Sequence, residues 1–258
     1  MIDTSLIITA FLKVFIYLIP LLALIALLKS PFFKGLIGEF FVNVLAKFCL
    51  DKSKYHLLKN VTLPTEDGTT QIDHIIVSRF GIFVVETKNL KGWIFGSEKQ
   101  PMWTQKIYRH SSKFQNPLRQ NYKHIKTLES ALEIEAEKFF SLIVFVGDST
   151  FKTPMPDNIT YGYGYIRFIK SKTDHVLDDD QVQKIVEKIQ QGRLQPSIKT
   201  HIDHARHVKA IVENKKKNIC PRCGSEIVIR VVKKGEDKGK EFWGCSNFPK
   251  CRYTREAA

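Results

Sequence analysis

Between Gln71 and Asn89, runs of apolar residues are interrupted by a few polar positions. This stretch, QIDHIIVSRFGIFVVETKN, predicts two strands of β-branched and aromatic residues joined at Phe80-Gly81. Shorter apolar runs predict strands near residues 55–63, 93–95 and 139–147. With helices before and between them, the predicted order is helix, three or four strands, helix, strand. This order indicates an α/β sandwich with a mixed central sheet.

Helical spacing predicts three helices, and one further strand is expected. Residues 35–50 form a helix expected to bury Ile37, Phe41, Val44, Leu45 and Phe48, with Glu39 and Asn43 on another face. Asn116-Pro117 predicts the start of a second helix, whose apolar positions are Leu118, Tyr122, Ile125, Leu128 and Leu132. The segment YIRFIK is expected to add an edge strand. DDDQVQKIVEKIQQG is expected to be an amphipathic helix with an acidic start.

The N-terminal segment from Leu6 to Leu28 is apolar apart from Thr9 and Lys13, which predicts a single transmembrane helix. A cleaved signal peptide is the alternative, but no basic residue precedes the apolar run and no small-x-small cleavage site follows it. Basic residues are concentrated after the span. The positive-inside rule therefore places the C-terminal domains in the cytoplasm and the anchor in the cell inner membrane.

Charge and domain organisation narrow the choice of partner. The net charge is +14, and residues 198–258, with fifteen Lys and Arg against seven Asp and Glu, contribute +8 of it. Such an excess favours a polyanion or a membrane surface as the partner, and nucleic acid is the first candidate. We divide the chain into an anchor (1–30), an α/β domain (31–170), a helical extension with a basic linker (171–215) and a cysteine-containing C-terminal domain (216–258).

Three polar residues interrupt the predicted hairpin. Glu86 and Lys88 share one face of their strand, and Asp73 joins them if the hairpin closes with a two- or four-residue loop. A three-residue loop would place Asp73 on the other face. Two carboxylates and the Thr87 carbonyl are hard oxygen ligands for Mg²⁺ or Mn²⁺, and Lys88 could assist a metal-bound water. Considered separately, a Glu-x-Lys pair is usually a solvated ion pair.

The surrounding motifs resemble the nuclease-related domain (NERD), a branch of the PD-(D/E)xK nuclease superfamily. The matching segments are GLIGEF, QIDHIIVS, GIFVVETKNLKGWIFG, MWTQ and FQNPLRQNYKHI, in family order from about Gly35 to about Gly147. The resemblance implies a restriction-endonuclease-like α-β-β-β-α-β core and metal-dependent phosphodiester hydrolysis. It places Glu39, Asp73, Glu86 and Lys88 at the acidic and lysine positions of the site, although superfamily members without activity exist. Many superfamily nucleases pair, so a homodimer is also expected.

Other polar and aromatic residues nearby are weaker candidates. Gln105, Tyr108 and Gln120 could contact metal-bound water or phosphate, or simply face solvent. His74 is interpreted as a structural histidine on the other face of the strand. Aromatic residues interleaved with basic ones could stack bases and hold phosphates, but core packing explains most of them equally well: Trp93, Trp103, Tyr108 and Tyr122, with Lys91, Lys99, Lys106, Arg109 and Lys113.

Four of the five cysteines form a metal-ligand pattern. Cys220-x2-Cys223 and Cys245-x5-Cys251 are separated by a segment that reads as two short strands and a polar turn. A unit this small cannot bury enough apolar surface to fold without a staple, so we predict a structural four-cysteine zinc ribbon. Cys49 is expected to be buried. The segment HIDHARHVK contains three histidines, His201, His204 and His207. On a helix they would not converge on one metal ion, so the segment is interpreted as a basic helix that faces DNA or solvent.

The ribbon resembles the C-terminal zinc finger of bacterial type I topoisomerases, on the segments CPRCGSEIVIRVVKKG and FWGCSNFPKCRYT. That module binds DNA, chiefly single-stranded. The residues expected to contact DNA here are Arg222, Arg230, Lys233, Lys234, Trp243, Lys250 and Arg252. The chain is too short to hold the strand-passage domains of a complete topoisomerase. The hypotheses are therefore a membrane-anchored, DNA-binding nuclease, a non-catalytic DNA tether, and a topoisomerase or DNA-processing accessory factor.

Overall fold

The computed structural model describes residues 4–65, 68–194, 219–220, 222–223, 225–232 and 239–256. The chain divides into two compact units, residues 1–195 and residues 196–258, which are described separately. The predicted basic linker and the HIDHARHVK segment lie outside the described residues.

Two helices begin the first unit, α1 (Thr4–Lys29) and α2 (Pro31–Cys49). Ser30 separates them because its hydroxyl accepts a hydrogen bond from the Phe33 amide and caps α2, while Pro31 occupies the first helical turn. Among the described residues, no single helix is long and apolar enough to cross a bilayer. One bent pair, Phe15–Lys29 with Pro31–Cys49, meets the criterion together across a 59° bend.

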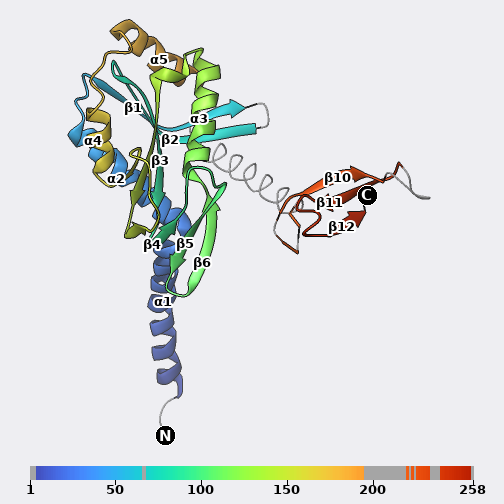
Figure 1. Ribbon diagram of the computed structural model, residues 1–258. Coiled ribbons are helices and arrows are strands. Elements are labelled where there is room, and N and C mark those ends of the chain that lie inside the picture. Colours follow the sequence, from blue (N-terminus) through green and yellow to red (C-terminus); the bar gives the residue numbers. More distant parts are fainter. Residues whose placement is uncertain are drawn as a thin grey trace. The chain divides into compact units, whose positions relative to one another are not determined.

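The central sheet of the first unit has five strands in the order β1-β2-β3-β7-β9 (Figure 1). These are β1 (Tyr55–Thr65), β2 (Gly68–Ser78), β3 (Gly81–Asn89), β7 (Phe139–Val146) and β9 (Ile159–Tyr161). The β1-β2-β3 ladder is antiparallel and the β3-β7-β9 ladder is parallel. The predicted α/β fold with a mixed central sheet is therefore confirmed.

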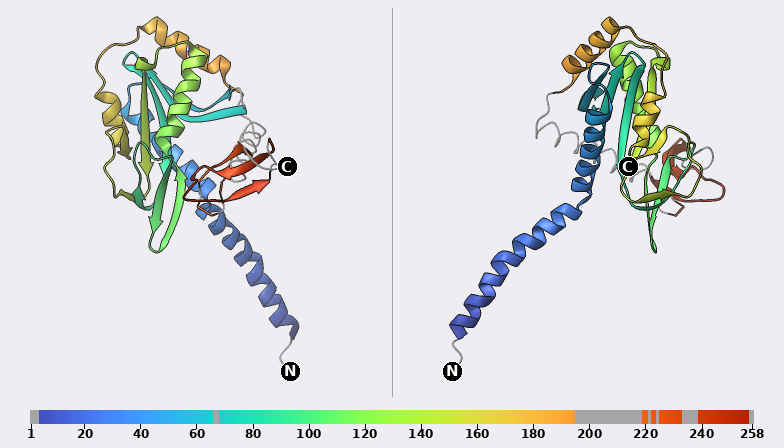
Figure 2. Two further views of the ribbon diagram at one scale, coloured as in Figure 1. Left: turned by 45° about the vertical axis from the view of Figure 1, so that its right-hand side comes forward. Right: turned by 90° about the vertical axis from the view of Figure 1, so that its left-hand side faces the viewer.

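Helices cover both faces of this sheet. On one face, α3 (Pro117–Leu132) and α5 (Asp179–Gly192) pack against an apolar core that includes Ile75, Val84 and Leu128. On the other face, α2 and α4 (Gly164–Lys170) pack against Phe83, Val85 and Val144. Figures 1 and 2 show the sheet between these two helical layers. The even-numbered residues of β3 thus face α3, and the odd-numbered residues face α2.

A second sheet has four strands in the order β6-β5-β4-β8. Its strands are β4 (Gly92–Phe95), β5 (Met102–Ile107), β6 (His110–Gln115) and β8 (Ser149–Phe151). The sequence predicted β4 but not the β5–β6 hairpin, because this hairpin contributes only Trp103 and Phe114 to the core of the sheet. With so few buried residues, the apolar alternation of β5 and β6 is too weak to reveal strands.

Three expectations about individual elements were wrong. YIRFIK lies in helix α4, where the buried residues Tyr165, Ile166 and Ile169 follow helical spacing. Tyr122 of α3 is exposed. Helix α2 buries Gly38, Val42 and Ala46, and leaves exposed Ile37, Phe41 and Phe48, which were expected inside. Small residues occupy the buried face of α2 because the helix lies close to the sheet.

Gly38 shows how close this approach is. A Cβ atom at Gly38 would lie 2.9 Å from Val146 Cγ2 and 3.0 Å from Asn89 Cβ, whereas one at Gly35 would meet nothing within 4 Å. Gly35→Ala is expected to stabilise the domain by about 0.5–1 kcal/mol through helix propensity. Gly38→Ala should instead destabilise it by about 1–3 kcal/mol through overpacking. Urea unfolding of the two variants measures this difference, and equal shifts would contradict the close packing of α2.

The second unit is a three-stranded antiparallel sheet in the order β10-β11-β12. Its strands are β10 (Ile227–Val231), β11 (Glu241–Cys245) and β12 (Thr254–Glu256). The two strands predicted between the cysteine pairs are confirmed as β10 and β11. The core contains Cys220, Ile227, Cys245 and Cys251, with Trp243 and Tyr253 packed against it.

Candidate functional site

The β2–β3 hairpin closes through a two-residue turn, Arg79-Phe80, with Ser78 paired to Gly81. The last pair of this ladder is His74 with Val85. Continuing the register by one residue places Asp73 across from Glu86. This is the shorter of the two loop lengths that bring Asp73 to the face of Glu86 and Lys88.

Asp73 lies where the strands separate. Beyond Val85, β3 leaves β2 and continues beside β7 up to the pair Asn89–Val146. On the other side of β2, the register with β1 omits the pair Asn60–Asp73, and Asn60 has a positive φ of 48°. The Asp73 side chain turns toward β3, where its Oδ2 accepts a hydrogen bond of 2.8 Å from the Thr87 amide. The divergence of the strands thus brings Asp73 to the start of the Glu86–Lys88 segment.

Glu86 and Lys88 form an ion pair on the face that α3 covers. Lys88 Nζ donates to Glu86 Oε1 at 2.6 Å and to Gln120 Oε1 of α3 at 2.9 Å. Glu86 is only 2% exposed, while the Lys88 side chain remains 21% exposed. Gln120 therefore joins the cluster as a partner of Lys88. Among the described residues, two of the three ammonium N–H groups of Lys88 are engaged.

Sequence reasoning missed His124, which lies one turn after Gln120 on α3. Its Nε2 is 3.3 Å from Glu86 Oε2, and its Nδ1 is 2.9 Å from the Thr70 hydroxyl of β2. The signal in the sequence was the i, i+4 spacing of Gln120 and His124, which places both side chains on one helix face. The contact with Glu86 is long for a hydrogen bond, so Glu86 Oε2 keeps capacity to accept another partner.

Glu39 of α2 interacts electrostatically with Asp73 and Glu86, and the three carboxyl groups differ in pKa. Burial and the Glu86 carboxylate raise the pKa of Asp73 well above its ordinary value. Burial and, to a smaller extent, Glu86 also raise the pKa of Glu39. Burial would raise the pKa of Glu86 as well, but Lys88 and His124 hold it below its ordinary value. Glu86 is thus the ionised partner of Lys88, and its charge opposes ionisation of the other two.

The donors of this cluster suit a hard divalent cation. Carboxylate oxygens are the ligands that Mg²⁺ and Mn²⁺ prefer, and Mg²⁺ keeps several waters when only one or two carboxylates bind it. Asp73 and Glu86 could supply such a pair. Within the described part of the chain, the only compact group of three or more His, Cys, Asp or Glu ligand atoms is the cysteine cluster of the second unit.

The remaining candidates of the first unit lie apart from these contacts. Gln105 of β5 donates to the Lys91 carbonyl at 2.8 Å. Tyr108, in the turn between β5 and β6, is 93% exposed. His74 is fully buried on the opposite face of β2, and burial lowers its pKa to about 4, so its ring is neutral.

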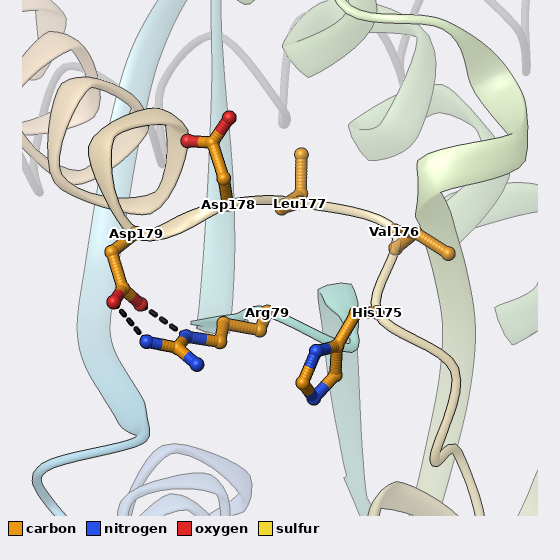
Figure 3. Close-up of a pocket in the computed structure, with 6 residues that line it drawn as sticks. All are labelled: Arg79, His175, Val176, Leu177, Asp178 and Asp179. Atoms are coloured by element: carbon orange, nitrogen blue, oxygen red, sulfur yellow. Dashed lines mark hydrogen bonds and ion pairs between the residues drawn. The ribbon is translucent and has the colours of Figure 1, made fainter.

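A separate cavity of about 470 Å³ lies at the turn of the β2–β3 hairpin (Figure 3). It is lined by Arg79 and residues 175–179. Arg79 forms a two-point ion pair with Asp179 across the cavity, and its carbonyl accepts hydrogen bonds from the Val176 and Leu177 amides. The lining contains none of the acidic cluster, because Asp73 and Glu86 lie at the far end of the paired segment. These contacts of Arg79 hold the start of α5 against the hairpin turn.

The four cysteines of the second unit have the geometry of a zinc site. Their sulfur atoms all lie within 4.8 Å of one another. Cys220 Sγ is 3.7 Å from Cys251 Sγ, and Cys223 Sγ is 3.4 Å from Cys245 Sγ. Four sulfurs bound tetrahedrally at about 2.3 Å would lie about 3.8 Å apart. Hydrogen bonds from the side chain and amide of Ser225 lower the pKa of Cys223 to about 6, which favours the thiolate.

The predicted DNA contacts of the ribbon are mostly exposed. Arg222, Lys250 and Arg252 are exposed, and Trp243 is half-buried under the Arg255 guanidinium at 5.6 Å. Arg230 is instead partly structural, since it donates to the Cys245 carbonyl at 3.2 Å and its guanidinium lies 5.7 Å from the Phe248 ring. Lys233 and Lys234 lie outside the described residues.

Two family profiles match separate parts of the chain. The profile of the nuclease-related domain matches residues 34–146, and the profile of the topoisomerase DNA-binding C4 zinc finger matches residues 217–258. The fold and both sites therefore define a protein with a nuclease-related domain and a topoisomerase-type, DNA-binding zinc ribbon.

An uncharacterized protein of Bacillus anthracis is 42% identical over 189 residues, which cover 69% of this chain and 88% of that protein. The chain and this Bacillus anthracis protein therefore belong to one family. DNA topoisomerase 1 of Archaeoglobus fulgidus is 42% identical over 57 residues, 20% of this chain and 8% of the topoisomerase. DNA topoisomerase 1 of Pyrococcus furiosus is 51% identical over 35 residues, 14% of this chain and 3% of that protein. The chain thus spans less than a tenth of these two topoisomerases.

Proposed function

We propose that the protein is a membrane-anchored, DNA-binding hydrolase that cleaves phosphodiester bonds with a divalent metal. The observation that carries this proposal is the meeting of Asp73, Glu86 and Lys88 where β2 and β3 separate. A simple surface ion pair would not need further partners. Here the Thr87 amide donates to Asp73, Gln120 accepts from Lys88, and His124 lies beside Glu86. The buried acidic cluster costs stability, which is common for catalytic groups.

Each residue of the cluster has a distinct proposed role. Asp73 and Glu86 would hold Mg²⁺ or Mn²⁺, and Glu39 would support the ion or its water. When bound, the ion supplies an acidified water and positive charge near the phosphate. The Lys88 ammonium directs its remaining N–H group toward the attacking water or a phosphoryl oxygen. Gln120 holds the Lys88 ammonium, and His124, together with Lys88, keeps the pKa of Glu86 low.

The N-terminal anchor is part of the same proposal. All side chains of α1 from Phe15 to Lys29 are exposed, and up to Leu28 they are almost entirely apolar. Such a surface is costly in water and stable in a bilayer. Lys29, the last residue of α1, and Lys34 of α2 support a single pass through the inner membrane with both domains in the cytoplasm. Release of the full chain from membranes by alkaline carbonate would contradict the anchor.

A cleavage assay tests the nuclease. The full chain in nanodiscs should cut supercoiled or branched DNA in Mg²⁺ or Mn²⁺, and Glu86→Gln should lower the rate at least 100-fold because it removes a metal ligand and the partner of Lys88. Glu129→Gln, an acidic residue elsewhere on α3, is the matched control and should cut normally. Cutting by Glu86→Gln at the wild-type rate would reveal a contaminant. Binding without cleavage in any metal would instead support a DNA tether.

A further inference from the structure

The small sheet β6-β5-β4-β8 has two chemically different faces. Opposed residues of neighbouring strands lie on the same face of a sheet. The register pairs Ile94 with Gln105 and Trp103 with Phe114, and this face packs into the core together with Phe151. The opposite face pairs Trp93 with Lys106, and Thr104 with Lys113. We call this second face the basic face: Trp93, Thr104, Lys106, Ser111 and Lys113, with Lys152 beside Trp93.

The basic face combines cations with an exposed aromatic ring. Trp93 is 49% exposed, and the Nζ atoms of Lys152 and Lys106 lie 4.7 Å and 6.0 Å from its ring. The chain around it is strongly basic, since residues 90–123 contain seven Lys and Arg and one acidic residue, Glu98. The β5–β6 hairpin presents further exposed groups at its turn, Tyr108, Arg109 and His110. A local excess of this size attracts polyanions.

The chain segment that forms β4, β5 and β6 begins and ends close in sequence to residues of the acidic cluster. β4 begins four residues after Lys88, and α3, which carries Gln120, begins directly after Asn116. The Lys88–Gln120 hydrogen bond of 2.9 Å therefore joins the point where the chain leaves for the small sheet to the point where it returns. The β5–β6 hairpin lies at the end of the domain where α3 begins (Figures 1 and 2). The basic face therefore belongs to a chain segment that starts and ends beside the cluster.

We propose that the basic face is a second polynucleotide-binding site, separate from the zinc ribbon, which guides the sugar–phosphate backbone to the acidic cluster. Lys106, Lys113 and Lys152 contact phosphates, and Trp93 stacks on an unpaired base, so single-stranded or frayed DNA is the favoured ligand. Only the guidance of the backbone to the acidic cluster rests on the proposed nuclease. Binding to the basic face requires neither catalysis nor a divalent metal.

Matched charge reversals test the site in the full chain, held in nanodiscs of zwitterionic lipid without added divalent metal. The test variant is Lys106→Glu, Lys113→Glu and Lys152→Glu. The control variant changes three other exposed lysines, Lys52→Glu, Lys170→Glu and Lys184→Glu, and therefore has the same net charge. The dissociation constant for a labelled single-stranded oligonucleotide is measured by anisotropy over a range of salt. The test variant should bind at least tenfold more weakly, and its salt dependence should fall by about 2–3 units of slope.

Trp93→Ala gives an independent readout. It should weaken binding of the single-stranded oligonucleotide about tenfold and of blunt duplex DNA much less, because only unpaired bases can stack. Equal weakening by the test and control variants would show that net charge, not this face, matters, and unchanged binding would leave the ribbon as the binding site. Lost binding to anionic lipid vesicles with retained oligonucleotide binding would assign the face to a membrane surface. A wild-type chain that binds but never cuts would reject the nuclease and leave this site intact.

Discussion

Replacing Cys220 with serine will unfold the zinc ribbon while the nuclease-related domain stays folded. The core of the ribbon consists of three buried cysteines and Ile227, so little apolar surface remains without the metal. Structural zinc supplies about 10–16 kcal/mol of apparent binding free energy to such units, far more than a sheet this small can supply itself. The two domains form separate compact units, so only the second unit should unfold.

Zinc analysis and amide hydrogen exchange measure this effect. Cys220→Ser should lose its zinc on dialysis against a chelator that the wild type withstands, and the amides of β10 and β11 should lose protection. The amides of β3 and β7 should keep theirs. Cys49→Ala is the matched control, because Cys49 lies on α2, far along the chain from the cluster, and should leave the zinc content at one ion per chain. A Cys220→Ser chain that retains zinc and its exchange protection would show that the ribbon folds without the fourth ligand.

The sequence predicted β1, β2, β3 and β7 of the central sheet because these strands are long and largely apolar, but it did not predict β9, which has only three residues. The β2–β3 hairpin and β7 appear as dense runs of Val, Ile and Phe, and helices start at recognisable caps such as Asn116-Pro117. Patterning could not choose the loop length of the hairpin, and the side on which Asp73 lies depends on that choice. Only the pairing of Ser78 with Gly81 resolves it.

Other features could not be predicted because the hydrophobicity of a residue does not show how closely two elements pack or which distant residues become neighbours. On α2, the largest apolar residues were expected inside, but the helix lies so close to β3 that only Gly38, Val42 and Ala46 fit. Phe41 and Phe48 are left exposed, on the helix that directly follows the apolar α1. His124 was missed for a related reason. Its partners Glu86 and Thr70 are distant in sequence and become neighbours only when α3 packs on the sheet.

Asp73→Asn is expected to abolish cleavage and to stabilise the nuclease-related domain at neutral pH. Burial and the Glu86 carboxylate raise the pKa of Asp73, so the folded protein favours the protonated form of this group. The folded state therefore binds more protons than the unfolded state at pH values between the ordinary and the raised pKa of Asp73. Its contribution to stability is fully present at low pH and is lost as the pH rises through the raised value.

Asparagine removes this penalty because it stays neutral at every pH and its oxygen can still accept the Thr87 amide hydrogen bond. The midpoint temperature of the domain should rise by about 2–4 °C for each kcal/mol regained, with a larger gain at pH 8 than at pH 5. Cleavage should fall at least 100-fold, since a neutral amide is a poor ligand for Mg²⁺. Calorimetry at the two pH values, run beside the cleavage assay, measures both effects.

The matched control is Asp157→Asn, an exposed aspartate of the same domain, which should change neither property. The two effects of Asp73→Asn have opposite signs because one carboxyl group causes both. A bound metal needs the ionised Asp73 carboxylate. Without the metal, burial and the Glu86 carboxylate make this ionised form unfavourable in the folded protein. Added Mg²⁺ should accordingly stabilise the wild type and leave Asp73→Asn almost unchanged. A variant that loses stability and cleavage together would show that Asp73 holds β2 to β3 as a structural residue and has no catalytic role.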